Sequence, residues 1–249
     1  MAFKDAKVIV TGGASGIGCA SARWFSDRGA SVAVFDRDDA KLDGIANFVV
    51  DVTDDEGVRE TVAAAITHLG GLDTLVNNAG IGAQGTVEDN DDDEWLRVLN
   101  INLLGLVRVT RACLPSLRQS ANASIVNTCS VAATVGLPER ALYSASKGAV
   151  ASLSLAMAAD YLHEGIRVNC VSPGTTDTPW IGRLLDQSTD PKAERAALKA
   201  RQPHGRLVTG EEVAAAIGYL AGPDSGSTTG ATLVVDGGLT TLRTRPSTQ

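Results

Sequence analysis

Short apolar runs rich in Val and Ile alternate along the chain with longer segments in which apolar residues recur every three or four positions. The short runs have the length and composition of buried β-strands, and the longer segments have the period of amphipathic helices. The pattern predicts seven strands, at Lys7–Thr11, Ser31–Asp36, Asn47–Val52, Asp73–Gly80, Ser124–Ser130, Arg167–Gly174 and Ala231–Gly238.

The helices expected between these strands determine the fold class. Strands that are joined through helices are expected to lie parallel, with the helices covering both faces of the sheet. We therefore expect an α/β protein: a single Rossmann-like, doubly wound domain of about seven parallel strands over residues 1–249. Only a very short helix is expected between the second and third strands. The longer helices are expected at Gly16–Arg28, Asp54–Leu69, Asp91–Arg118, Ala141–His163 and Thr209–Leu220.

The segment 179–203 interrupts this alternation with polar and helix-forming residues. It follows the carboxyl end of a predicted strand, which is where α/β folds place their binding crevice. We expect a mobile substrate lid here, with an ordinary surface insertion as the alternative. Trp180, at the start of the segment, is expected to pack the lid down or to cover the cofactor pocket.

Composition and charge exclude several classes of protein. The 249 residues are 44% hydrophobic, which is enough for a large core and argues against disorder. The 29 acidic and 22 basic residues give a net charge of −7, the wrong sign for a surface that binds nucleic acid. The chain shows neither a signal peptide nor an apolar stretch of the length that crosses a membrane, so no membrane association is expected.

Four cysteines lie far apart, without a Cys-x-x-Cys pair or a nearby histidine at ligand spacing. This spacing predicts neither a metal site nor a disulfide framework, and it fits a cytoplasmic protein best. The histidines His68 and His163 are expected at helix ends, and His204 in an exposed loop.

A glycine-rich turn, Thr11-Gly-Gly-Ala-Ser-Gly-Ile-Gly18, joins the first strand to the first helix. Glycines in this context allow a tight turn and let backbone N–H groups at the helix start approach a pyrophosphate. An ordinary tight turn is the alternative, but strand, spacing and helix agree on a dinucleotide site. The contacts are expected from Gly12, Ser15, Gly16, Ile17 and Gly18.

Asp36 ends the second strand, 18 residues after Gly18. A carboxylate at about this offset accepts hydrogen bonds from the adenosine ribose hydroxyls and repels a 2′-phosphate, so NAD is expected rather than NADP. Arg37 weakens this preference, because an arginine pairs well with that phosphate. The adenine is expected to meet Asp51 and Val52, and the second ribose Asn78, Ala79 and Gly80.

Tyr143 and Lys147 are four residues apart at the start of a predicted helix, so their side chains share one face. An adjacent ammonium favours the phenolate form of a tyrosine, which turns it into a usable acid/base. Ser130, at the end of the preceding strand, is placed to bind the substrate oxygen. Taken singly, the three residues also fit packing, surface charge and a turn cap.

The order of the motifs resembles the short-chain dehydrogenase/reductase family over nearly the whole chain. The motifs are TGGASGIG, NNAG, INLLG, SVAATVGLPERALYSASK, VSPGTTDTP and VVDGG. The resemblance implies that Tyr143 is the general acid/base, Lys147 holds the nicotinamide ribose, and Ser130 orients the substrate. It further implies that Asn102 holds a water beside the lysine, and that Pro173, Gly174, Thr176 and Thr178 contact the cofactor.

The resemblance also bears on substrate and assembly. The segments VSPGTTDTP and ARQPHGRLVTGEE are similar to the branch with cytosolic type 2 3-hydroxybutyrate dehydrogenases and 2-keto-3-deoxy sugar acid dehydrogenases. Relatives are usually homotetramers or homodimers. Apolar residues on the two longest helices support such pairing: Val150, Leu153, Leu155 and Met157.

Arginines near the predicted site point to an anionic substrate. Arg140 lies three residues before Tyr143, and Arg201 and Arg206 flank the end of the predicted lid. A guanidinium fork donates two parallel hydrogen bonds to a carboxylate, and Gln202 is expected to add a further polar contact. The alternative is surface salt bridges with Glu139, Glu211 or Glu212.

The leading interpretation is an NAD-dependent enzyme that interconverts a secondary alcohol and a ketone, on a small hydroxy acid or sugar acid. One alternative is an NADPH-dependent carbonyl or 3-oxoacyl reductase, which Asp36 disfavours. A second is a binding module that senses NAD without catalysis, and a third is a structural scaffold. The clustering of polar residues at predicted strand ends disfavours the scaffold.

Overall fold

The structure is a computed structural model that describes residues 3–186 and 188–244. Seven strands in this part of the chain form one parallel sheet in the order β3-β2-β1-β4-β5-β6-β7. The predicted α/β fold with seven parallel strands is confirmed. The strands are β1 Lys7–Thr11, β2 Ser31–Asp36, β3 Ala46–Val49, β4 Thr74–Asn77, β5 Ser124–Thr128, β6 Arg167–Pro173 and β7 Thr232–Val235.

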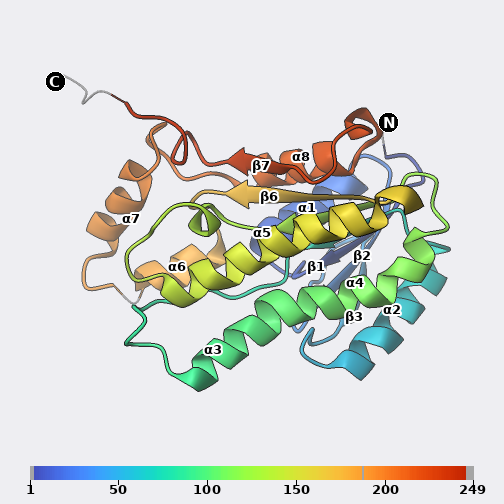
Figure 1. The fold of residues 1–249 in the computed structure, drawn as a ribbon, viewed down its shortest axis with the longest axis horizontal. Helices are drawn as coiled ribbons and strands as arrows, with labels where there is room; N and C mark the ends of the chain where they lie inside the picture. Colours follow the sequence, from blue (N-terminus) through green and yellow to red (C-terminus); the bar gives the residue numbers. More distant parts are fainter. Residues whose placement is uncertain (1–2, 187, 245–249) are drawn as a thin grey trace.

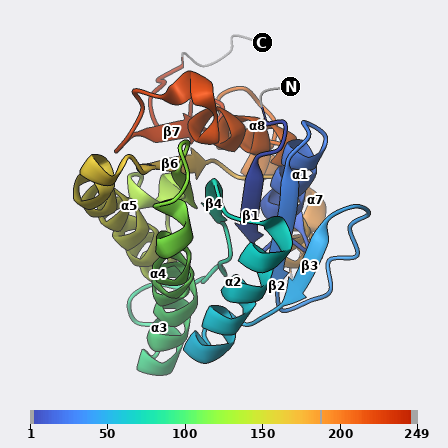
Figure 2. The same cartoon turned by 90° about the vertical axis from the view of Figure 1, so that its right-hand side faces the viewer.

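Helices cover both faces of the sheet (Figures 1 and 2). On one face Val8 and Val10 of β1 pack with α1 (Gly16–Ser26) and α8 (Gly210–Ala221). On the other face Ile9 packs with α2 (Asp55–Leu69), α4 (Leu106–Leu117) and α5 (Ala141–Tyr161). Helices on both faces explain why the central strands β1, β4 and β5 are buried over almost their whole length.

The link between β2 and β3 corrects one expectation, because residues 37–45 contain bends and a turn but no short helix. Side chains compete with helical hydrogen bonding here: Asp36 accepts from the amide of Asp38, and Asp39 from the amide of Lys41. Leu42 is buried in the core, so the segment crosses the sheet as a packed loop.

The expected helix Asp91–Arg118 is present with an irregularity. It consists of α3 (Asp92–Leu99), a π-helical segment η1 (Asn100–Gly105) and α4 (Leu106–Leu117). The Asp91 side chain caps its start. Within the described residues, Asp92–Leu117 is also the one helix long and apolar enough to cross a membrane by length and composition, and 44% of its most apolar window is buried inside the protein. Core helices share these properties, and this one packs against the sheet.

The segment after β6 forms two helices, α6 (Pro179–Asp186) and α7 (Pro191–Ala200). They enclose a small apolar cluster of Ile181, Leu185, Leu198 and Leu207, separate from the cores on the two sheet faces. Of the predicted lid, Gln187 lies outside the described residues. The remaining elements are the short 3-10 helices η2 Val131–Ala133, η3 Leu162–Glu164 and η4 Pro223–Ser225.

Candidate active site

The candidate site lies where the strand order reverses. After β1 the chain continues to β2 on one side, and after β4 it continues to β5 on the other, so the connections diverge at the carboxyl ends of these two neighbours. A cleft of about 310 Å³ opens at this edge. Fourteen predicted site residues line it: Ser15, Gly16, Ile17, Asn78, Gly80, Ser130, Arg140, Tyr143, Lys147, Pro173, Gly174, Thr176, Thr178 and Arg201.

The glycine turn forms one end of the cleft. A Cβ on Gly18 would overlap the carbonyl oxygen of Gly12, so only glycine permits this approach of turn and helix. The Asn78 amide donates to the carbonyls of Thr11 and Gly12, at 3.1 and 3.2 Å, and ties the end of β4 to the turn. Because α1 begins at Gly16, its unpaired N–H groups face this space. The cradle fits a pyrophosphate.

Asp36 lies beside the same turn, at the end of β2. One of its carboxylate oxygens, Oδ2, accepts a 2.9 Å hydrogen bond from the Ala14 amide. Arg37 is exposed, at the start of the loop that follows β2. Further along the same sheet edge, Asp51 accepts hydrogen bonds from the amide and hydroxyl of Thr53, both 2.8 Å. Predicted cofactor residues from β1, β2, β3 and β4 are thus collected along one edge.

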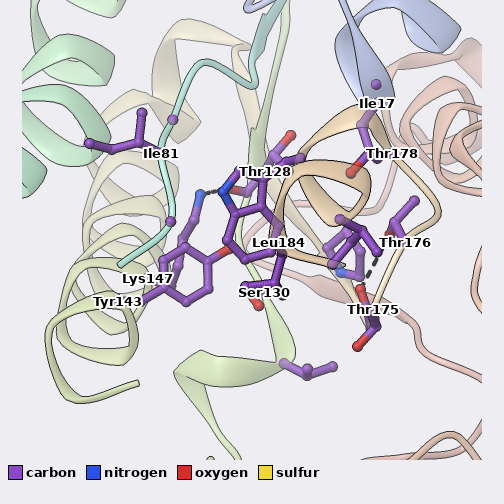
Figure 3. Close-up of a pocket in the computed structure, with 18 of the residues that line it drawn as sticks. Ile17, Ile81, Thr128, Ser130, Tyr143, Lys147, Thr175, Thr176, Thr178 and Leu184 are labelled. Atoms are coloured by element: carbon purple, nitrogen blue, oxygen red, sulfur yellow. Dashed lines mark hydrogen bonds between the residues drawn. The ribbon is translucent and has the colours of Figure 1, made fainter. Parts of the chain in front are cut away.

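Tyr143, Lys147 and Ser130 meet in the cleft (Figure 3). Tyr143 and Lys147 come from the first two turns of α5. Lys147 is 5% exposed, and its Nζ donates a 2.9 Å hydrogen bond to the carbonyl of Thr128. Ser130 follows β5, where its Oγ accepts from the Ala132 amide at 3.2 Å. The strand end thus places the hydroxyl and holds the ammonium beside the phenol.

Asn102 does not line the cleft but supports it from the π-helical segment. Its Oδ1 accepts from the Ile81 amide at 2.8 Å, and its Nδ2 donates to the Ile81 carbonyl at 2.9 Å. The same Nδ2 donates to Ser146 Oγ at 3.0 Å, and Ser146 Oγ donates to the Tyr143 carbonyl. Asn102 therefore joins the segment after β4 to the helix that carries Tyr143 and Lys147. A π-helical turn often marks such a functional position.

The segment after β6 forms the opposite wall of the cleft, with Thr176 and Thr178 across from α5 in Figure 3. The Gly174 amide donates to the Val235 carbonyl at 2.9 Å. Thr176 forms an isolated parallel bridge with Val208. These bonds fix the wall to the end of β7 and to the approach to α8.

Arginines gather at the outer part of the cleft. Arg140 and Arg201 line it as predicted, together with Arg183 of α6, which the sequence analysis did not identify. Burial and the neighbouring Arg201 guanidinium lower the pKa of Arg140 from its usual value. Within the described residues, none of the three forms an ion pair. The charges of Glu139 and Glu194 act on Arg140, but neither acid forms an ion pair with it, so the cleft carries close positive charges that no ion pair neutralises among the described residues.

The structure does not bring Gln202 and Arg206 into the cleft. Gln202 is 1% exposed, and its Nε2 donates to the carbonyls of Thr175 and Arg206, at 3.2 and 2.6 Å. Arg206 pairs with Glu212 through two hydrogen bonds of 2.6 and 2.8 Å, the salt bridge that was the alternative. Both residues hold the chain around the lid through these bonds, while the buried Oε1 of Gln202 has no hydrogen-bond partner among the described residues.

Trp180 also lines the cleft, and its indole packs against the backbone of Gly82 on the other side. Arg183 could have been found from helical spacing, because it lies three residues after Trp180 on the same helix. Of the histidines, His68 stacks edge-on with Phe48, and His163 and His204 are exposed outside the cleft. The described residues contain no group of three His, Cys, Asp or Glu that could hold a metal.

Comparison with known proteins gives consistent matches over almost the whole chain. The family model described as enoyl-(acyl carrier protein) reductase matches residues 12–240. The chain is 37% identical to 2-(S)-hydroxypropyl-CoM dehydrogenase 3 of Xanthobacter autotrophicus, covering 96% of this chain and 98% of that one. It is 38% identical to cis-4-hydroxycyclohexanecarboxylate dehydrogenase of Sinomonas cyclohexanicum, covering 97% and 99%.

Two further matches complete this comparison. Dehydrogenase/reductase SDR family member 6 of Rattus norvegicus is 37% identical, covering 94% of this chain and 97% of that one. Among solved structures, the ligand-free aldohexose dehydrogenase of Thermoplasma acidophilum superposes with a TM-score of 0.94 at 31% identity, covering 99% of this chain and 98% of that one.

Proposed function

The chain belongs to the short-chain dehydrogenase/reductase family, and from that premise we propose that it is an NAD-dependent dehydrogenase of a small hydroxy acid or sugar acid. As a member of this family it is an oxidoreductase that acts on CH–OH groups with a nicotinamide cofactor. The proposal adds two points: NAD rather than NADP, and a carboxylate on the substrate.

The carboxylate is carried by one observation, the approach of Arg140 and Arg201 in the cleft, where neither forms an ion pair with an acid among the described residues. Two guanidinium groups that repel each other in a partly buried site are stabilised by an anion placed between them. Arg183 adds a third positive charge to the same wall. The relative from Sinomonas cyclohexanicum is named for a hydroxycarboxylate, which supports this choice.

The choice of NAD is supported by the position of Asp36. Its carboxylate adjoins the glycine turn, where the adenosine ribose of a dinucleotide lies in folds of this type. The start of α1 fits the pyrophosphate, because Ser15, Gly16 and Ile17 line the cleft there and the missing Cβ of Gly18 lets the turn pack closely against the helix. A 2′-phosphate would meet the negative charge of Asp36.

The side chains in the cleft suit a proton transfer coupled to oxidation of an alcohol. When bound, the nicotinamide supplies the acceptor or donor for the hydride. Ser130 Oγ binds the substrate oxygen, and the Tyr143 phenolate takes the hydroxyl proton as the alcohol becomes a ketone. Lys147 stabilises the phenolate and returns the proton toward solvent past Asn102. The same groups act in reverse order when a ketone is reduced.

We further propose that residues 179–203 form the substrate lid. The two helices α6 and α7 share their own apolar cluster, so they can shift together without opening either main core. Trp180 and Arg183 both project from α6 into the cleft. Movement of this segment would therefore expose or enclose the substrate.

The proposed homotetramer or homodimer is supported by apolar side chains outside the core. The structure buries Val150 and Met157, but Leu155 of α5 is 58% exposed. Leu96 of α3 and Leu104 of η1 are 66% and 46% exposed. Figure 1 shows these helices running along one face of the molecule.

All four cysteines are free thiols, which supports the proposed reducing, cytoplasmic setting.

The proposal is tested by NAD reduction with hydroxy acids and with the methyl esters of the same acids. Each hydrogen bond to a charged group contributes about 1.5–3 kcal/mol, so we expect Arg140→Ala and Arg201→Ala to raise KM for the acids about 10- to 100-fold. The KM for the esters should stay unchanged, because an ester offers no charge to these arginines.

Arg59→Ala is the matched control, since Arg59 is an exposed arginine of α2 far from the cleft. It should behave as the wild type on both kinds of substrate. The proposal of a carboxylate substrate would be contradicted if the wild-type enzyme preferred the neutral esters and if Arg140→Ala and Arg201→Ala left KM for the acids unchanged.

A further inference from the structure

The loop between β4 and α3 contacts the segment that begins α5 (Figure 1). Gly85 in this loop forms an isolated parallel bridge with Arg140. The Gly85 amide donates to the Glu139 carbonyl at 3.0 Å, and the Ala141 amide donates to the Gly85 carbonyl at 3.3 Å. The residue enclosed by these two bonds is Arg140, which lines the cleft.

Gly85 is held in a conformation that other residues rarely adopt. Its φ is +122°, and a Cβ built on it would lie 3.0 Å from both the Asn90 amide nitrogen and the Asp89 Cβ. Asn90 is itself fixed, because its Nδ2 donates to the Gln84 carbonyl at 2.8 Å and to Glu94 at 2.9 Å. The loop therefore presents the Gly85 peptide to α5 from a rigid base.

Glu139 is also unusual, with a φ of +55° in a residue that carries a side chain. Such a left-handed conformation costs about 1–2 kcal/mol for a residue with a Cβ. In this conformation the Glu139 carbonyl accepts two hydrogen bonds. One comes from the Gly85 amide and the other, of 2.9 Å, from Nη1 of Arg140. The Gly85 bridge offsets that cost and fixes the carbonyl to which the guanidinium is bonded.

Without the hydrogen bond to the Glu139 carbonyl, solvation and charge repulsion would favour movement of the Arg140 guanidinium away from the cleft. Burial and the neighbouring Arg201 lower its pKa and favour movement of the charge toward water, while the nearby Glu139 and Glu194 favour the charge where it lies. An arginine side chain also has about 2 kcal/mol of rotamer entropy to lose when it is held in one position. A guanidinium fixed in advance binds an anion more tightly, because this ordering is complete before binding.

We propose that Gly85 is a positioning residue for the substrate anion: its peptide holds the Glu139 carbonyl, which in turn holds the Arg140 guanidinium in the cleft. This inference rests on the proposed function, because it assumes that Arg140 binds the carboxylate. It gives the loop after β4 a second role. Asn78 and Gly80 serve the cofactor end of the cleft, and Gly85 sets the affinity for the charged end of the substrate.

The test is Gly85→Ala, assayed with hydroxy acids and their methyl esters. We expect KM for the acids to rise about tenfold, the equivalent of about 1.4 kcal/mol, while kcat at saturation, KM for the esters and the Kd for NAD stay within about twofold. Gly165→Ala is the control, because Gly165 has a φ of +73° with open space around it, at the far end of α5. It imposes similar backbone strain without touching the cleft.

A double-mutant cycle with Arg140→Ala separates the two proposals. If Gly85 acts through Arg140, the double variant is no worse on acids than Arg140→Ala alone. If Arg140→Ala raises KM but Gly85→Ala does not, or if the two effects add, the positioning role is wrong and the proposed function stands. If Arg140→Ala has no effect on acids, both are wrong.

Substitutions of the exposed Glu139 provide a second test of the inference if the Gly85→Ala variant folds poorly. Glu139→Val disfavours the left-handed conformation through its branched Cβ, so it should raise KM for the acids several-fold. Glu139→Gly loses the same carboxylate but permits that conformation, so its KM for the acids should be several-fold lower than that of Glu139→Val. Equal KM values for the two variants would overturn the inference.

Discussion

The Lys147 Nζ lies 5.9 Å from the centre of the Tyr143 ring, one helical turn along α5, and it is hydrogen-bonded to the Thr128 carbonyl. The carbonyl orients the ammonium without neutralising it, because no carboxylate pairs with Lys147 among the described residues. The positive charge therefore remains available to the neighbouring phenol.

Tyr143→Phe tests whether this phenol transfers the proton. Removing a general acid/base lowers kcat by about 100- to 10,000-fold, while the aromatic ring that shapes the cleft remains. We expect NADH formation to fall in that range and the Kd for NAD to change less than about twofold. Tyr219→Phe is the control, since Tyr219 is 48% exposed on α8. A Tyr143→Phe variant with wild-type turnover would disprove the acid/base role.

Asp36→Asn tests the choice of cofactor. The amide oxygen can still accept from the Ala14 amide, so the bond to the turn is retained, while the charge and the bond from the Asp38 amide are lost. We expect the Kd for NAD to rise and that for NADP to fall, each by about tenfold, because a charge-assisted bond and a repulsion both disappear. Both constants are measured by titration calorimetry.

The matched control for this pair of titrations is Asp43→Asn, an exposed carboxylate in the loop after β2. It should leave both constants unchanged. If the wild-type protein binds NADP more tightly than NAD, the alternative of an NADPH-dependent carbonyl or 3-oxoacyl reductase is favoured instead.

Glu212 predicts a pH dependence of stability. Hydrogen bonds from Arg206 and from the Thr209 amide lower the pKa of Glu212 to about 2, from a usual value of 4.5. Because the pKa is lower in the folded state, the ionised Glu212 stabilises the protein at pH values above its usual pKa of 4.5. That contribution is lost as the pH falls from about 4.5 to about 2. The side chain is 39% exposed, so solvent screening reduces the contribution to about 1 kcal/mol.

Glu212→Gln should therefore lower the free energy of unfolding by about 1 kcal/mol at pH 7, and by much less at about pH 3. Urea denaturation at the two pH values measures the difference. Glu60→Gln, an exposed acid of α2 without an ion pair among the described residues, controls for net charge. A deficit that stays constant with pH would contradict the assignment to the Arg206 pair.

Much of this arrangement could be predicted because it depends on local sequence. The apolar runs determine the strands, and parallel strands bring their carboxyl ends to one edge, so residues such as Asp36 and Ser130 are placed once the sheet is known. The four-residue spacing of Tyr143 and Lys147 likewise follows from helix geometry.

The lid residues could not be placed in this way. Arg201 and Gln202 are neighbours in sequence, yet one lines the cleft and the other is buried, because the end of α7 turns them to opposite sides. That direction depends on how α6 and α7 pack together, which periodicity does not reveal. The π-helical turn around Asn102 was not predicted either, because it is defined by backbone hydrogen bonds between residues five apart, which the spacing of apolar residues does not specify.

Gln202→Leu distinguishes a supporting role from a substrate contact. The leucine keeps a comparable volume but removes the hydrogen bonds to the carbonyls of Thr175 and Arg206. Each such bond contributes about 0.5–1.5 kcal/mol, so we expect the free energy of unfolding to fall by about 1–3 kcal/mol. The Kd for NAD should also rise, because Thr175 follows the Gly174 backbone that lines the cofactor end of the cleft.

The pattern of kinetic effects decides between these roles for Gln202. A residue that supports the wall weakens cofactor binding with acids and esters alike, whereas a substrate contact raises KM for the acids alone. Gln119→Leu, at the exposed end of α4, is the control for loss of a surface amide. If the Gln202→Leu enzyme is stable, binds NAD normally and loses affinity for acids alone, Gln202 contacts the substrate. The lid would then have to rearrange when substrate binds, because the Gln202 amide is buried in the structure.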